Sequence, residues 1–141
     1  MYSNKKKTIW LIGSAGLAWN LYGVYQFLQS VLSTKESMLS MGMSEVQAQL
    51  MSSYPIWMDV AFAVGTFGGT LGCILLLMKN KFTKSVFLTS LIGYVALFIG
   101  DITEGVFAAL GAQQVVILSL VLLIAAGLFY YSAKIEKEIL T

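Results

Sequence analysis

The chain has 141 residues, of which 57% are hydrophobic and 11% are charged, and its formal net charge is +2. Its mean hydropathy of +0.78 lies outside the range of soluble domains and is typical of an integral membrane protein. Histidine is absent and Cys73 is the only cysteine, which excludes a His-based catalytic triad, an intrachain disulfide and a cysteine-based zinc site.

Four hydrophobic segments follow one another along the chain. A membrane-spanning helix needs about 20 apolar residues, and such segments occur at residues 8–28, 55–78, 85–106 and 114–131. We therefore expect an all-α fold, with residues 1–141 forming a single transmembrane domain of four bundled helices. The first segment follows lysines as a signal peptide does, but it is longer and lacks a clear cleavage site, so we interpret it as an uncleaved span.

Residues 30–54 form the only long polar stretch. Ser44 and Gln47 have the spacing of a capping box, and apolar residues then recur at helical intervals. This pattern predicts a short amphipathic helix over about residues 44–52, which would lie on the membrane surface or over one end of the bundle.

The lysines predict the orientation of the chain. If both termini are cytoplasmic, eight of the nine lysines lie inside and only Lys35 lies outside, in agreement with the positive-inside rule. The loop at 30–54 is then outside. Most of the acids fall at or near this outer face, namely Glu36, Glu45, Asp59, Asp101 and Glu104.

Small residues recur at helical spacing in the first two predicted spans. Such stripes let helices approach closely in lipid, where packing drives association. We expect these glycines to pack against another helix of the bundle or of a second protomer: Gly13, Gly16, Gly23, Gly65, Gly68, Gly69 and Gly72.

The third span carries polar residues on one broad face, including Ser90, Tyr94, Asp101 and Glu104. A carboxylate is costly at the bilayer centre and less so near an interface. Asp59 has a similar outer depth, as do Gln26, Gln113 and Gln114. If these stripes converge, neighbouring carboxylates would bind a proton or a cation. The candidate binding residues are Asn20, Asp59, Tyr94, Asp101 and Glu104.

A structural interpretation of the same residues stays open. Asn20 lies within the glycine stripe of the first span, so it is either a hydrogen-bonding contact between helices or a ligand contact. Asp101 and Glu104 are either part of a site or solvated acids at a helix end.

Three stretches carry a resemblance to known proteins: WNLYGVYQ at 19–26, PIWMDVAFAVGTFGGTLGCILLL at 55–77, and the lysine-containing turn that follows. They resemble a family of small bacterial membrane proteins that are often labelled sugar transporters. The resemblance implies a four-helix, multi-pass protein of the bacterial inner membrane. It does not extend to the acids of the third span.

The first function that fits is a transporter, a channel-like protein or a solute-binding subunit with an acidic outward-facing site for a small polar solute or a cation. Because four helices rarely enclose a pathway alone, this function implies a homo-oligomer or a larger membrane complex. The second is a structural or accessory subunit that packs on a larger membrane complex through its glycine faces.

The third function is handling of Cu(I) outside the membrane. Met38, Met41 and Met43 have the MxxM and MxM spacing of thioether copper sites. We do not expect an enzyme, because the sequence has no nucleophile paired with a base, no phosphate-binding glycine loop and no cofactor signature. We also expect no cofactor and no nucleic-acid partner.

Overall fold

A computed structural model describes residues 2–53 and 55–136, and the regular structure in these residues is entirely helical. The expected all-α fold is therefore confirmed for this part of the chain. The helices are α1 (Tyr2–Leu32), α2 (Lys35–Ser40), α3 (Glu45–Ser52), α4 (Ile56–Leu77), α5 (Thr83–Thr103), α6 (Val106–Leu110) and α7 (Ala112–Ile135).

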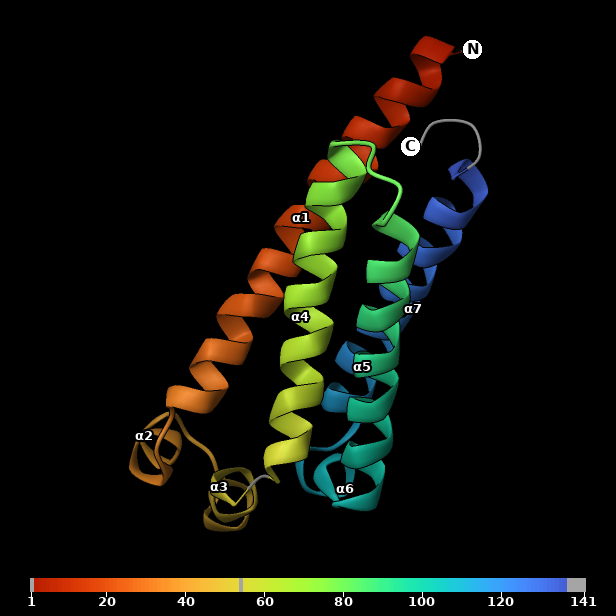
Figure 1. Ribbon diagram of the computed structural model, residues 1–141. Coiled ribbons are helices and arrows are strands. Elements are labelled where there is room, and N and C mark those ends of the chain that lie inside the picture. The colour runs from red at the N-terminus through yellow and green to blue at the C-terminus, as the bar shows by residue number, and fades with distance from the viewer. Residues whose placement is uncertain (1, 54, 137–141) are drawn as a thin grey trace.

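The four long helices form an open bundle in the order α1, α4, α5, α7 (Figure 1). α4 packs between α1 and α5, and α7 packs on the other side of α5, so α1 and α7 are the edge helices. The first turn of α1, the turn between α4 and α5 and the last turn of α7 lie at one end. The opposite end, which we call the capped end, carries α2, α3 and α6.

Three of the four expected spans have the length and apolarity needed to cross a bilayer. These are α4, α5 and α7, and α1 is not among the described helices that qualify. Asn20, Gln26 and several tryptophan and tyrosine side chains lower the hydropathy of α1. The three apolar helices make the chain a small helical membrane protein.

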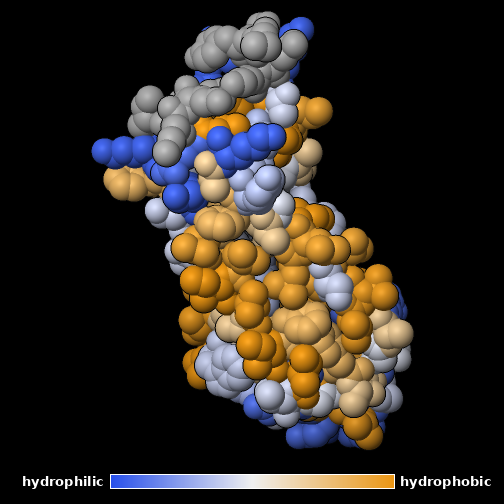
Figure 2. Space-filling view, turned by 90° about the vertical axis from the view of Figure 1, so that its right-hand side faces the viewer, coloured by the Kyte–Doolittle hydropathy of each residue, from blue (hydrophilic) through white to orange (hydrophobic). Residues whose placement is uncertain are grey.

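Large apolar side chains cover much of the outer surface of these helices. On α7 they include Val116, Ile117, Leu120, Leu123 and Tyr130, all exposed. Figure 2 shows that the face on this side is largely hydrophobic between two ends that carry hydrophilic residues. An apolar surface of this extent is typical of contact with lipid.

The helix bounds differ from the expected ones mainly around the connections. α3 begins after Ser44 with the predicted capping box, in which Ser44 and Gln47 bond each other's backbone N–H groups. The structure adds two helices that the sequence pattern did not reveal, α2 and α6. The third span ends at Thr103 and not at 106, because Gly105 takes a left-handed conformation (φ 76°) that stops α5.

The predicted packing glycines lie in contacts between helices of this one chain. A Cβ added to Gly13 or Gly23 on α1 would meet side chains of α4, and one added to Gly65 or Gly72 on α4 would press on rings of α5. Gly16 and Gly69 lie between α1 and α4, and Gly68 faces α5. α4 therefore presents a glycine face, Gly65, Gly68 and Gly72, to α5 and a single glycine, Gly69, to α1.

Candidate functional site

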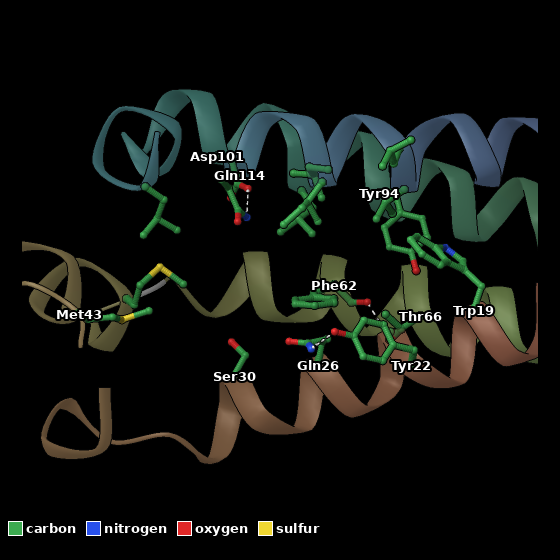
Figure 3. A pocket seen from close by; sticks show the side chains of 18 residues that line it. Trp19, Tyr22, Gln26, Ser30, Met43, Phe62, Thr66, Tyr94, Asp101 and Gln114 are labelled. Atoms are coloured by element: carbon green, nitrogen blue, oxygen red, sulfur yellow. Dashed lines mark hydrogen bonds between the residues drawn. The ribbon is translucent and has the colours of Figure 1, made fainter. Parts of the chain in front are cut away.

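A cavity of about 500 Å³ lies between the four long helices toward the capped end (Figure 3). We call it the main cavity. Its wall combines aromatic rings, apolar side chains and a few polar groups. The aromatic residues are Trp19, Tyr22, Phe62 and Tyr94, and the polar ones include Gln26, Ser30, Thr66, Asp101 and Gln114.

Asp101 supplies the carboxylate of this wall. It lies in the last turn of α5 and its side chain is buried, with 1% exposed. Gln114 Nε2 donates a long hydrogen bond of 3.5 Å to Asp101 Oδ2. In Figure 3 the two side chains meet on one side of the main cavity, across from Gln26 and Ser30 of α1.

The connection between α5 and α7 brings Asp101 and Gln114 together. Gly105 and Gly111 both have positive φ, 76° and 84°, so the chain reverses twice around α6. Gln114 N–H then donates to the Gly111 carbonyl in the first turn of α7. This short return positions Gln114 opposite the last turn of α5.

Tyr94 lies two turns deeper on the same face of α5. Its ring packs against Gly65, where an added Cβ would lie 2.6 Å from the ring carbons. Its hydroxyl approaches Gly23, on α1. Tyr94 and Asp101 both line the main cavity.

Asn20, Asp59 and Glu104 lie outside the main cavity. Asn20 is buried between α1 and α4, where its Nδ2 donates to the Gly16 carbonyl at 2.8 Å and approaches Cys73 Sγ at 3.7 Å. Asp59 is half-buried and lines a second hollow of about 350 Å³, which shares Ser30 and Met51 with the wall of the main cavity.

Glu104 is exposed, because it caps the C-terminus of α5 where the helical face that carries Asp101 has ended. The structure therefore does not bring the three carboxylates together. In the described part of the chain, no three His, Cys, Asp or Glu side chains group as metal ligands.

The three methionines of the proposed copper site lie in different surroundings. Met38 is buried, Met41 is exposed and Met43 lines the main cavity. Met51 of α3 lines the cavity as well. Two of the methionine side chains at the capped end thus serve as apolar cover for the cavity.

The sequence interpretation missed the aromatic wall of the main cavity. Trp19, Tyr22 and Gln26 are spaced by three and four residues, so they form one stripe of α1 beside its glycine stripe. That spacing was a usable signal. Which stripe faces the cavity depends on the rotation of α1 against α4, which the Asn20 and Gly69 contact fixes.

Comparisons of this chain with protein-family models, with curated proteins and with solved structures find no match. The resemblance to small bacterial membrane proteins stays a prediction, and the function has to be argued from the cavity itself.

Proposed function

We propose that this membrane protein binds a small organic cation in the main cavity, as a solute-binding or transport component. The observation that carries the proposal is the Asp101 carboxylate, buried on the wall of a cavity of about 500 Å³. Cavities of about 300 to 1,000 Å³ are typical of small-molecule sites.

The charge of the wall favours a cation. Among the described residues that line the main cavity, Asp101 is acidic and no lysine or arginine occurs. A carboxylate that is removed from water and placed at membrane depth is either protonated or neutralised by a positive partner. A bound ammonium group would add a positive charge beside a carboxylate that already has a hydrogen-bond partner in Gln114.

The aromatic rings favour an organic cation over a metal ion. Trp19, Tyr22 and Tyr94 present aromatic rings to the cavity, and such rings attract organic ammonium groups through cation–π interactions. A metal ion would need several oxygen ligands, and the second and third acids of the predicted site lie elsewhere.

Asp101→Asn tests this proposal. With tetraethylammonium as the probe, we expect the wild-type protein in lipid nanodiscs to bind saturably and the variant to bind about tenfold more weakly or worse, since a tenfold loss is about 1.4 kcal/mol. Glu104→Gln is the matched control, because Glu104 is exposed and outside the cavity. Equal tetraethylammonium binding by wild type and Asp101→Asn would refute the proposal.

The accessory-subunit alternative loses its main support. The glycine faces that suggested it pack α1, α4 and α5 against one another within the chain. An oligomer stays part of the proposal, since the open bundle leaves its two edge helices with little mutual contact.

We also propose that α1 crosses the bilayer, with both termini cytoplasmic in a bacterial inner membrane. α1 packs along α4 and reaches both ends of the bundle (Figure 1). Single cysteines introduced at Lys7 and Ser85 should then be protected from an impermeant thiol reagent applied outside, while one at Ser44 should react. All three positions are exposed, and the native Cys73 is buried. Labelling of Lys7→Cys from outside would show that α1 does not span.

A further inference from the structure

The main cavity opens sideways between the two edge helices. Its wall residues on α5, among them Tyr94 and Asp101, are buried, whereas Tyr22 on α1 and Ile117 and Leu120 on α7 are about half exposed. The exposed part of the wall thus belongs to α1 and α7. One side of this opening is α7, a helix long and apolar enough to cross a bilayer, so in a membrane the opening would face hydrocarbon.

Side chains of the connecting segments cover the main cavity at the capped end. Met43 and Met51 lie over the cavity, and Gln47 Nε2 ties α3 to α6 by donating to the Ala109 carbonyl at 3.0 Å. Val106 of α6 is fully buried beneath this cover. The sideways opening therefore gives a ligand a way to Asp101 that does not require this cover to be displaced.

An apolar groove continues from the main cavity along the same seam. This α1/α7 groove has a volume of about 400 Å³, and its wall includes Ile12, Ala15 and Trp19 of α1 and Ile124, Gly127 and Tyr131 of α7. Trp19 lines both hollows, so the groove and the cavity adjoin at this side chain. Beyond the groove the apolar cluster of Ile9, Leu128 and Ile135 joins the two helices.

We propose that the ligand is an amphiphilic amine taken from the bilayer, with its ammonium group at Asp101 and its hydrocarbon chain in the α1/α7 groove. This inference rests on the proposed function and adds the ligand's class and its route. A molecule with a charged head and an apolar tail matches this pair of hollows, because the main cavity carries the Asp101 carboxylate and the α1/α7 groove is apolar. A helix of a second copy would supply only the apolar part.

The test has to locate the hydrocarbon chain of the ligand, because an affinity does not show whether that chain lies in the groove or in the lipid. Lipid tails are as apolar as the groove, so transferring a chain from lipid into the groove gains little hydrophobic free energy. Dodecyltrimethylammonium with a bromine at the chain end is a suitable probe, since bromine quenches the fluorescence of a nearby tryptophan. Trp10→Phe and Trp57→Phe together leave Trp19 as the sole reporter in phosphatidylcholine vesicles.

We expect quenching of Trp19 to saturate as the bromine-labelled probe is added. The probe concentration at half-maximal quenching should be about tenfold or more lower than in a control protein whose only tryptophan is Trp10. Trp10 is 68% exposed and lines neither hollow, so it reports simple partition into lipid. Gly127→Phe should abolish the saturable quenching of Trp19. Gly127 lines the groove and a Cβ there would meet nothing within 4 Å, so the larger side chain enters the groove from an open position. Ala15→Phe, on the opposite wall, should act in the same way.

The two measurements together distinguish failure of the amphiphile proposal from failure of the proposed function. Loss of saturable quenching in Gly127→Phe with unchanged tetraethylammonium binding supports both proposals. Tetraethylammonium binding without saturable quenching of Trp19, or saturable quenching that survives both groove variants, overturns the inference and leaves the function standing. Failure of wild type to bind tetraethylammonium overturns both. If a second copy fills the groove, the wild-type protein should be a dimer and Gly127→Phe a monomer, and neither should show saturable quenching of Trp19. That result would also overturn the inference.

Discussion

Gly93→Leu is expected to separate α4 from α5 and to cause a large loss of stability. A Cβ at Gly93 would lie 2.9 Å from the carbonyl oxygen of Ala61 and 2.9 Å from the amide nitrogen of Gly65, both in the backbone of α4. A helix backbone cannot rotate away as a side chain can. Overpacking costs about 1 to 3 kcal/mol, and we expect this substitution to reach the upper end of that range.

Separation of the two helices would also break a polar contact. Ser90 Oγ donates to the Gly65 carbonyl at 2.6 Å, so α5 bonds α4 one turn from Gly93. Thermal unfolding of the purified protein in detergent measures the loss. Gly127→Leu is the matched control, since that position has open space around it. A melting temperature for Gly93→Leu equal to that of the control would show that α4 and α5 are further apart than this packing requires.

The long helices could be predicted because their signals are local. Hydropathy located α4, α5 and α7 to within a few residues, and the capping box located α3. α2 and α6 have six and five residues, too few for a periodic pattern to emerge. The glycine faces could also be predicted, because close helix contact in lipid requires small side chains. Their partners could not, since the sequence does not say which helix lies opposite.

The candidate site was harder to predict because it depends on helix rotation as well as depth. Asp59, Asp101 and Glu104 share a depth, yet Asp59 lies in another hollow and Glu104 lies beyond the last turn of α5. Tyr94 and Asp101 were placed together because both lie on one helix face. Gln114 lies beside Asp101 because the chain reverses direction at Gly105 and Gly111, and no periodic sequence pattern predicts that reversal.

Gly69→Ala is the second substitution for which we expect a large effect. Its Cβ would overlap Oδ1 of Asn20 and lie 2.6 Å from Cγ of the same side chain. The obstruction is a side chain, but Asn20 is held in place by its bond to the Gly16 carbonyl and is only 3% exposed. Moving the amide would leave a polar group unpaired among apolar helices. We therefore expect a loss of about 1 to 3 kcal/mol.

Asn20→Ala supplies the partner for a double-mutant cycle, because it removes the atoms that an alanine at position 69 would strike. The double variant, Asn20→Ala with Gly69→Ala, should be more stable than the sum of the single effects predicts, by about 0.5 to 3 kcal/mol, as expected for residues in contact. Combining Asn20→Ala with Gly127→Ala should give additive effects, since Gly127 has no neighbour near its added Cβ. Thermal unfolding measures all five variants. Additive effects in the Asn20 and Gly69 pair would mean that α1 does not present Asn20 to α4, and the rotation that turns Trp19 and Tyr22 toward the main cavity would lose its basis.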